Sequence, residues 1–327
     1  MLLLLCFVVS FLITFLTLPI WIKAAKKAGL VGRDMNKYEK PEIAEIGGIC
    51  VVAGLLSGLL FYIGIKTFYF KSTTNIVELL ALISTVLIIT IVGIIDDALG
   101  WKIGIKRRYK PLLCLAAAVP LMVIAAGYTK ITIPLLGSID IGLLYPLLIV
   151  PLAIVGASNG FNMLAGYNGL EAGMGIIILA TLGAVTWQIG TTWIALVSFC
   201  AVSALIAFLF YNHFPAKVFP GNTLTYAIGA LIACVTILGN VERAALILFI
   251  PYFLELGLKT KGKFKKESFG LPKKDGSLEL RYPKIYGLEH IAIVILKKLK
   301  PSHKVYEQEI VVLLLLVEVI IATTIIF

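Results

Sequence analysis

The sequence predicts an all-α integral membrane protein in which about ten transmembrane helices form a single polytopic domain over residues 1–327. Hydrophobic side chains make up 60% of the chain and charged side chains only 14%, whereas charged residues are about a quarter of a soluble domain. The mean hydropathy is +0.99. The apolar runs are about 17 to 25 residues long, the length that a helix needs to cross about 30 Å of hydrocarbon.

Ten apolar runs are candidates for these helices. We expect them at about residues 1–22, 43–65, 76–95, 111–127, 141–161, 170–187, 190–210, 222–240, 242–258 and 305–327. The first run has no basic leading region and a basic cluster follows it, so we expect a retained span rather than a cleaved signal peptide. The five cysteines are scattered through apolar runs without CxxC spacing, which is typical of small apolar side chains rather than of disulfides or metal ligands.

Positive charge predicts the orientation, because Lys and Arg in short loops stay on the cytoplasmic side. With ten spans and an outer N-terminus, 25 of the 29 Lys and Arg residues fall in inner loops, most of them in 23–42, 96–110 and 259–304. The sequence therefore predicts a multi-pass protein of the cell membrane, with both termini outside and its polar loops in the cytoplasm. The net charge of +11 then faces the anionic lipid bilayer, and nucleic acid is not an expected partner.

Two adjacent carboxylates, Asp96 and Asp97, end the third apolar run and precede five basic residues between Lys102 and Lys110. Adjacent acids repel each other, and the C-terminal end of a helix is unfavourable for anions. The pair therefore predicts a nearby cation, either a metal ion or the basic run. A helix-end pair that simply reaches water is the structural alternative.

An inner loop at 158–173 contains no Lys or Arg but offers Asn159, Asn162 and Asn168 between glycines. Asn159 and Asn162 share a face if they lie on a helix. Carboxamides supply neutral oxygen ligands for a hard cation, and they also pair with the edge of a base or with sugar hydroxyls. This pattern favours a metal site or a substrate-binding loop over an ordinary turn.

Two shorter inner segments carry further candidates. Residues 32–48 contain Asn36 and Lys37, for which a solvated basic turn is the alternative to a binding role. In 216–230, Gly221 interrupts the chain and Asn222 can cap the next span. Because a helix N-terminus also attracts anions, a capping role and a binding role can hold together at this position.

The segment 259–304 is predicted to be a cytoplasmic insertion between spans nine and ten. Its centre has the pattern of a small β-hairpin that turns at Asp275 and Gly276. Residues 288–300 are apolar with a basic end, which predicts an amphipathic helix at the membrane interface. Long loops are usually functional or disordered, and the hairpin pattern favours function.

Together these segments suit a phosphorylated water-soluble donor, a divalent metal and an acceptor that lives in the bilayer. A membrane transporter is the alternative from a different class of protein. Transporters place ionisable groups near the bilayer midplane, whereas the polar residues here gather at one face and Glu318 is the notable acid within a span.

The stretches "GIIDDALG" (93–100), "NGFNMLAGYNGLEAG" (159–173) and "VFPGNT" (218–223) together resemble the polyprenyl-phosphate N-acetylhexosamine-1-phosphate transferases. "NMLAGYNGLEAG" and "LELRYPK" are most similar to the branch that uses dolichyl phosphate and UDP-GlcNAc, and "DMNK" (34–37) extends the likeness toward the N-terminus.

This resemblance implies ten helices, cytoplasmic active-site loops and Mg²⁺, with Mn²⁺ as the alternative ion. It implies transfer of GlcNAc-1-phosphate from UDP-GlcNAc to a dolichyl-type polyprenyl phosphate with release of UMP, the first step of lipid-linked oligosaccharide synthesis for protein N-glycosylation. Transfer of a phospho-muramyl peptide, or of another sugar phosphate from its UDP-sugar, is the alternative within the superfamily. The sequence leaves open whether the protein forms a homodimer.

The resemblance also implies roles for individual residues. Asp96 and Asp97 match the catalytic acidic pair that orients or deprotonates the acceptor phosphate, and Lys110 best matches the basic residue that follows it. Asn162 matches a residue that contributes to the metal site. Asn159, which lies beside it, is assigned to substrate binding. Asn168 and Gly169 match the part of the site that holds the uridine. The other positions assigned to substrate binding are Asn36, Lys37, Glu171, Lys265 and Lys266.

The sequence departs from the family pattern at three places. Asn222 stands where family members usually have a metal-binding Asp, so a carboxylate has become a carboxamide. An Asn oxygen can still bind Mg²⁺ but brings no charge, which predicts weaker metal binding or greater reliance on the pyrophosphate. Lys265 and Lys266 stand where the branch has Arg, and Lys lacks the bidentate fork of Arg. About four extra residues precede Lys110.

Overall fold

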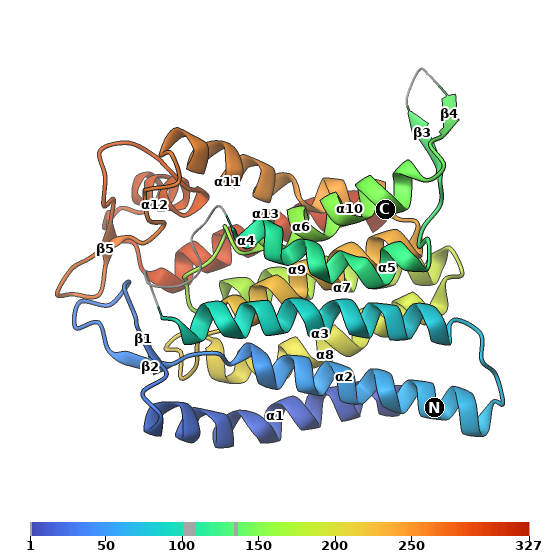
Figure 1. Cartoon of the computed structure of the whole chain (residues 1–327). Coiled ribbons are helices and arrows are strands. Elements are labelled where there is room, and N and C mark those ends of the chain that lie inside the picture. Colours follow the sequence, from blue (N-terminus) through green and yellow to red (C-terminus); the bar gives the residue numbers. More distant parts are fainter. Residues whose placement is uncertain (1, 101–108, 134–136, 327) are drawn as a thin grey trace.

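The computed structural model describes residues 2–100, 109–133 and 137–326 as a bundle of helices with three small two-stranded sheets (Figure 1). Among the described residues, seven helices are long and apolar enough to cross a membrane. They are α1 (Leu4–Lys27), α2 continued by the π-helical turn η1 (Gly48–Gly64 and Ile65–Tyr69), α3 (Ile76–Ala98), α7 (Leu170–Gln188), α8 (Thr192–Asn212), α9 (Gly221–Gly239) and α13 (Glu307–Ile326). The protein is therefore a multi-pass membrane protein.

The other three expected spans, 111–127, 141–161 and 242–258, are built from shorter pieces. These are α4 (Lys110–Leu115), η2 (Ala116–Ala118) and α5 (Val119–Val123), then η3 (Tyr145–Ile149) and α6 (Val150–Phe161), then α10 (Glu242–Leu248) and α11 (Ile250–Lys261). The last piece of each group has a proline as its second residue, Pro120, Pro151 or Pro251. Proline has no N–H and clashes with the preceding turn, so each of these segments is divided there, whereas α1 continues through Pro19.

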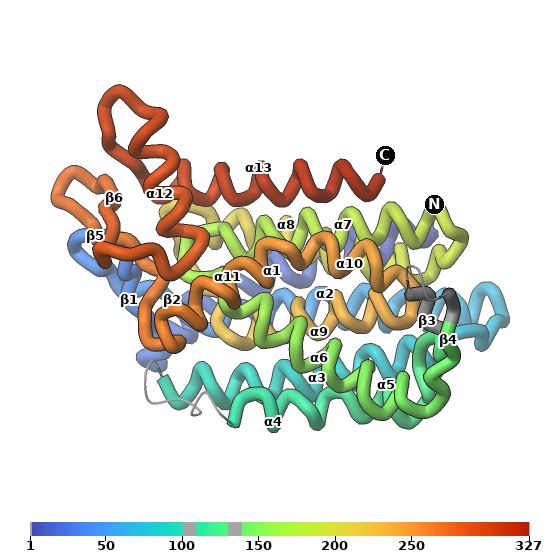
Figure 2. The backbone as a smooth tube through the Cα atoms, turned by 90° about the horizontal axis from the view of Figure 1, so that it is seen from above, coloured from blue at the N-terminus to red at the C-terminus, as the bar shows by residue number. Residues whose placement is uncertain are grey.

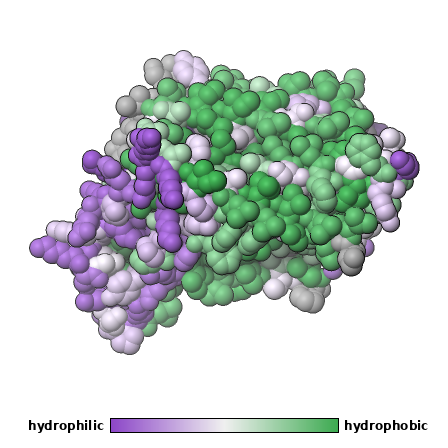
Figure 3. Space-filling view, turned by 90° about the horizontal axis from the view of Figure 1, so that it is seen from below, coloured by the Kyte–Doolittle hydropathy of each residue, from purple (hydrophilic) through white to green (hydrophobic). Residues whose placement is uncertain are grey.

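One end of the bundle carries most of the polar structure. There β1 (Val31–Arg33) pairs antiparallel with β2 (Glu42–Ala44), and β5 (Leu271–Pro272) pairs with β6 (Leu278–Glu279). Helix α12 (Leu288–Leu299) lies beside them and ends at Lys297 and Lys298 (Figures 1 and 2). The space-filling view shows hydrophilic residues gathered at this end and hydrophobic residues over most of the remaining surface (Figure 3). We call it the polar end.

The opposite end carries both chain termini and the hairpin of β3 (Lys130–Ile133) and β4 (Gly137–Asp140) (Figure 1). The two termini therefore lie on the same side of the apolar region. We call this the terminal end.

Helix α9 lies at the centre of the bundle, and 83% of the residues in its most apolar 18-residue stretch are buried inside the protein. Glycines let neighbouring backbones approach it closely, as small residues do in membrane helix packing. A Cβ added at Gly48, Gly93 or Gly229 would lie 2.4 Å from Leu224 N, 2.7 Å from Thr223 Cα or 2.4 Å from Ala157 O, respectively. These contacts from α2, α3 and α6 fix the first turns of α9 at the polar end.

Candidate active site at the polar end of the bundle

Asp97, in the last turn of α3, binds the N-terminus of α9. Its Oδ1 accepts a hydrogen bond from Asn222 N at 2.8 Å, and its Oδ2 accepts one from Thr223 N at 2.9 Å and one from the Thr223 hydroxyl at 2.6 Å. The first N–H groups of a helix have no partner within it, and the helix dipole favours an anion there. The N-terminus of α9 thus offsets the unfavourable position of Asp97 at the C-terminal end of α3.

Asp96 is only 3% exposed and is neutralised by a cation. Its Oδ2 lies 2.5 Å from Lys110 Nζ, at the start of α4, and 2.5 Å from the side-chain nitrogen of Asn222. Asn222 therefore contacts both acids, Asp97 through its backbone and Asp96 through its side chain. The structure thus joins Asp96, Asp97, Lys110 and Asn222, which are far apart in the sequence, in one cluster that we call the acid cluster.

The glycine before Asn222 is required by this geometry. Gly221 has a φ of +69°, a conformation that residues with a Cβ rarely adopt. A Cβ at Gly221 would lie 2.4 Å from Asp97 Oδ2. Gly221 therefore allows both the turn into α9 and the close approach of the carboxylate.

Asn162, at the C-terminal end of α6, faces the same first turn of α9. Its Oδ1 accepts a hydrogen bond of 2.8 Å from the hydroxyl of Thr225, which lies one residue after Leu224 on α9. Asn159 lies one turn earlier on α6, where its side-chain nitrogen donates to Val155 O at 2.9 Å and lies 3.6 Å from Cys114 Sγ on α4. The two asparagines thus connect α6 to α9 and to α4 around the acid cluster.

Tyr226 is a residue that sequence reasoning did not select. It lies four residues after Asn222, so it occupies the same face of α9 one turn deeper. The side chain is fully buried, and its hydroxyl has no hydrogen-bond partner among the described residues. An apolar run gives no sequence signal for such a residue.

The oxygens around the first turn of α9 fit a hard divalent cation. Asp96 and Asp97 offer carboxylates and Asn162 and Asn222 offer carboxamides, and these are ligands that Mg²⁺ accepts. With one oxygen from each of these side chains an octahedral shell is incomplete, so substrate oxygens or water would complete it. No cluster of three His, Cys, Asp or Glu residues suited to a metal occurs within residues 2–100, 109–133 and 137–326.

A second polar cluster at the same end joins three distant segments through Asn36. The side chain of Asn36 is 2% exposed. Its nitrogen donates to Gly166 O at 2.9 Å, and its oxygen accepts from Gly270 N at 3.2 Å. Asn36 therefore ties the N-terminal hairpin to the asparagine-rich loop and to the long segment 259–304.

Asn168 and Lys37 extend this cluster to the start of α13. Asn168 donates from its backbone to Glu307 at 2.7 Å and from its side chain to Asp34 at 3.1 Å. Lys37 forms an ion pair with Glu307 and lies 3.4 Å from Asp34. Neither Asp34 nor Glu307 was selected from the sequence. We call Asp34, Asn36, Lys37, Asn168 and Glu307 the loop clamp, because it holds four chain segments together.

Gly169 and Glu171 position the start of α7. Gly169 has a φ of +88° immediately before the helix. Glu171 is 4% exposed and accepts a hydrogen bond of 2.8 Å from Gly166 N, while its second oxygen has no partner in the described part of the chain. Both residues thus shape the asparagine-rich loop.

The two selected lysines of the long segment behave differently from an arginine nearby. Lys265 and Lys266 are exposed, and Lys266 Nζ lies 4.7 Å from the ring centre of Tyr282. Arg281, which sequence reasoning passed over, pairs with Glu267 at 2.5 Å and donates to Gly270 O at 3.3 Å. Arg281 therefore lies against the same loop that Asn36 contacts.

Glu45 is a further acid near the site that lay unnoticed within an expected span. It lies between β2 and α2, outside the helix. Burial and, to a smaller extent, the negative charge of Asp97 together raise the pKa of its carboxyl to about 7. A half-buried acid beside the acid cluster therefore changes charge near neutral pH.

Residues 79–240, from α3 to α9, match the model of glycosyl transferase family 4. A Saccharolobus solfataricus protein, provisionally named a UDP-N-acetylglucosamine–dolichyl-phosphate N-acetylglucosaminephosphotransferase, is 39% identical over 87% of this chain and 86% of its own. The chain belongs to glycosyl transferase family 4. The matched region contains the acid cluster and the asparagine-rich loop.

Two further relatives show the range of activities named in this family. A Dictyostelium discoideum protein named UDP-N-acetylglucosamine–dolichyl-phosphate N-acetylglucosaminephosphotransferase is 30% identical over 74% of this chain and 68% of its own. A phospho-N-acetylmuramoyl-pentapeptide-transferase of Halalkalibacterium halodurans is 30% identical over 80% of this chain and 85% of its own. The family thus includes proteins named for both of the donors that the sequence suggested.

Proposed function

We propose that this protein transfers GlcNAc-1-phosphate from UDP-GlcNAc to a dolichyl-type polyprenyl phosphate and releases UMP. The observation that carries the proposal is the acid cluster, in which two acids, a lysine and a helix N-terminus converge at the end of an apolar bundle. A lipid phosphate and a water-soluble nucleotide can meet only at such a boundary. The names of the relatives from Saccharolobus and Dictyostelium support this donor and acceptor. The product would begin a lipid-linked oligosaccharide for protein glycosylation.

In the proposed topology, the three interrupted segments also cross the membrane, giving ten spans with both termini outside and the polar end in the cytoplasm. Both termini lie at the end opposite the polar end, which an even number of crossings requires. The concentration of Lys and Arg in the loops of the polar end supports a cytoplasmic location.

In the proposed reaction, an oxygen of the acceptor phosphate attacks the β-phosphorus of UDP-GlcNAc. A new P–O bond joins the two phosphates while the bond to the bridging oxygen breaks, and UMP leaves with that oxygen. A lipid monophosphate has a second pKa of about 6 and is mostly dianionic at neutral pH. The main requirement is therefore to bring two anions together, with the attacking and leaving oxygens in line at the phosphorus.

The residues of the acid cluster would meet this requirement in different ways. Mg²⁺, or alternatively Mn²⁺, would supply charge neutralisation of the pyrophosphate when held by Asp96, Asp97, Asn162 and Asn222. Lys110 brings a fixed positive charge beside Asp96 at 2.5 Å, within reach of an approaching phosphate. Asp97, held by three hydrogen bonds, has a fixed orientation from which it can position the acceptor or accept its residual proton.

The uridine and sugar would lie toward the loop clamp. Asn36, Lys37 and Asn168 are bonded to protein groups there, so we assign them to shaping this part of the site as well as to contact with the nucleotide. Asn159, Gly169 and Glu171 support the same loop, and the exposed Lys265 and Lys266 are available to the phosphates of an incoming donor.

The proposal is tested with a donor panel. Purified protein in zwitterionic detergent receives one polyprenyl phosphate and, in separate reactions, UDP-GlcNAc, UDP-GalNAc, UDP-glucose or UDP-MurNAc-pentapeptide, each with Mg²⁺ or with EDTA. We expect UMP release chiefly with UDP-GlcNAc and only with the divalent ion. Preference for UDP-MurNAc-pentapeptide would support the alternative activity named for the Halalkalibacterium relative. Absence of UMP release with all four donors would refute both activities.

A further inference from the structure

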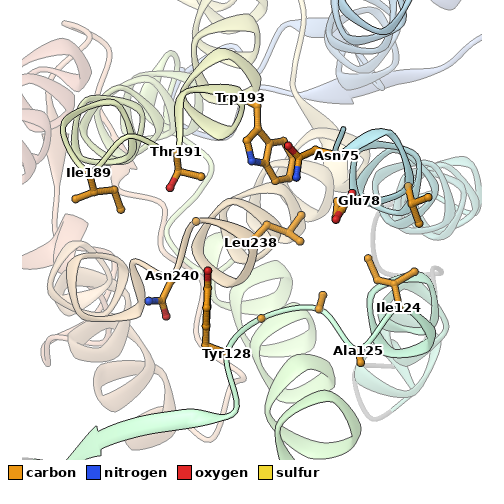
Figure 4. Close-up of a pocket in the computed structure, with 14 residues that line it drawn as sticks. Asn75, Glu78, Ile124, Ala125, Tyr128, Ile189, Thr191, Trp193, Leu238 and Asn240 are labelled. Atoms are coloured by element: carbon orange, nitrogen blue, oxygen red, sulfur yellow. The ribbon is translucent and has the colours of Figure 1, made fainter. Parts of the chain in front are cut away.

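A cavity of about 550 Å³, whose lining residues are drawn in Figure 4, lies at the terminal end of the bundle. It is bounded by the start of α3, the connection after α5, the turn between α7 and α8, and the end of α9. The acid cluster lies at the other ends of α3 and α9. Helices of this length separate the two places by about 30 Å at 1.5 Å per residue. The cavity therefore belongs to neither the acid cluster nor the loop clamp.

Six side chains with polar groups line this cavity: Asn75, Glu78, Tyr128, Thr191, Trp193 and Asn240 (Figure 4). Within the described ranges, no hydrogen bond or ion pair joins any of these side chains to another residue. This contrasts with the polar end, where the loop clamp is fully engaged with protein partners. These polar groups are half-buried or exposed, with Tyr128 63% exposed, so they are open to water or to a ligand that enters the cavity.

The walls are held in conformations that cost free energy. Asn75 and Asn240 have φ values of 59° and 53°, and Ala125 has a φ of 49°. Asn tolerates this left-handed region, but Ala rarely adopts it. Asn75 and Asn240 are the cap residues of α3 and α9, where this conformation is ordinary for Asn, so Ala125 is the residue whose conformation the surrounding structure imposes.

The chemistry of the lining selects against a phosphate. Glu78 is the single ionisable acid among the lining residues, and neither Lys nor Arg lines the cavity. Carboxylate, carboxamide and hydroxyl groups together donate and accept hydrogen bonds, which matches a group with several hydroxyls. Trp193 and Tyr128 present aromatic rings with polar edges, as side chains do at the level of lipid headgroups.

The rim of the cavity is apolar and open. Val77 is 62% exposed and Ile189 is 55% exposed, and they lie at the start of α3 and just after the end of α7, so the rim offers apolar surface at the edge of the apolar region. A ligand with a hydroxylated head and an acyl chain would bury both kinds of surface. We propose that this cavity binds the polyhydroxyl, uncharged headgroup of a membrane lipid, with its chains along Val77 and Ile189.

The test measures lipid retention by the full-length protein. Protein is purified in a zwitterionic detergent without a sugar headgroup, mixed with equal amounts of monogalactosyl diacylglycerol and phosphatidic acid, and analysed by native mass spectrometry. We expect retention of the galactolipid over phosphatidic acid. Glu78→Gln combined with Asn240→Ala should weaken galactolipid retention at least tenfold. Thr73→Ala, an exposed change outside the cavity, should leave retention unchanged.

Thermal unfolding confirms that each variant is folded, and competition by an excess of methyl galactoside in the same mass-spectrometric experiment tests the free sugar. Retention of the galactolipid in the presence of this excess supports a lipid. Displacement of the galactolipid at equal concentrations of the two ligands would overturn the lipid source and place a soluble sugar in the cavity. Equal retention of both lipids, or equal retention by parent and double variant, would overturn the proposal. These readouts do not involve sugar-phosphate transfer, so they stand apart from the proposed function.

Discussion

Replacing Asp97 should separate chemistry from donor binding. The carboxylate accepts three hydrogen bonds, two of them from the backbone of α9. Loss of a helix-capping group costs about 0.5–2 kcal/mol of stability. Loss of a preorganised charge at a reacting centre typically lowers turnover by about 10²- to 10³-fold, or about 2.7–4 kcal/mol. We therefore expect Asp97→Ala to lower kcat by at least about a hundredfold and to change the KM for UDP-GlcNAc by less than about threefold.

The assay is UMP release by purified protein at several donor concentrations, with a thermal unfolding curve for each variant. Thr223→Val is the matched control, because it removes one of the three hydrogen bonds to Asp97 and leaves the charge and both backbone donors. A neutral hydrogen bond contributes about 1 kcal/mol, so this variant should lose some thermal stability and less than about tenfold in kcat. An Asp97→Ala protein that turned over at the parental rate would refute the role assigned to this residue.

Three further changes test the surroundings of Asp97. Lys110→Met removes the cation 2.5 Å from Asp96, and we expect kcat to fall about 10- to 100-fold, with Lys110→Arg recovering part of it; a rate unchanged in Lys110→Met would exclude this lysine from catalysis. Asn222→Asp places a third carboxylate in the acid cluster, beside Asp96, so it should lower the melting temperature in EDTA. It should also lower the half-saturating Mg²⁺ concentration about tenfold, about 1.4 kcal/mol; the same Mg²⁺ dependence as the parent would argue against a metal ligand there. Glu45, with its pKa raised from 4.5 to about 7, binds its proton more tightly in the folded protein, so its contribution to stability is full below about pH 4.5 and is lost as the pH rises through 7. Glu45→Gln should therefore raise the melting temperature at pH 8 more than at pH 5, and equal shifts at both would contradict this assignment.

The sequence allowed the membrane class and the main polar positions to be predicted, because both leave local signals. Long apolar runs follow directly from the thickness of a bilayer, and adjacent acids such as Asp96 and Asp97 stand out within them. The partnership of these acids with Asn222 and Lys110 followed from their shared predicted side of the membrane, and the structure joins all four.

The remaining features depend on contacts that no local pattern encodes. Asp97 caps α9 rather than its own helix, and the loop clamp relies on Glu307, which lies at the start of the last helix and 270 residues from Lys37. The interruptions near Pro120, Pro151 and Pro251 fell inside runs whose average hydropathy hid them. Glu45 and Tyr226 gain their importance only from burial beside the acid cluster.

The central claim is that the acid cluster transfers a sugar together with its phosphate. UDP-GlcNAc carrying ³²P at the β-phosphate decides this, because the labelled phosphorus is the atom that is attacked. With polyprenyl phosphate and Mg²⁺, we predict that the label moves into the organic-soluble lipid, that unlabelled UMP is released, and that Asp97→Ala slows both at least about a hundredfold. Label that stays in water-soluble UDP while GlcNAc reaches the lipid would contradict it.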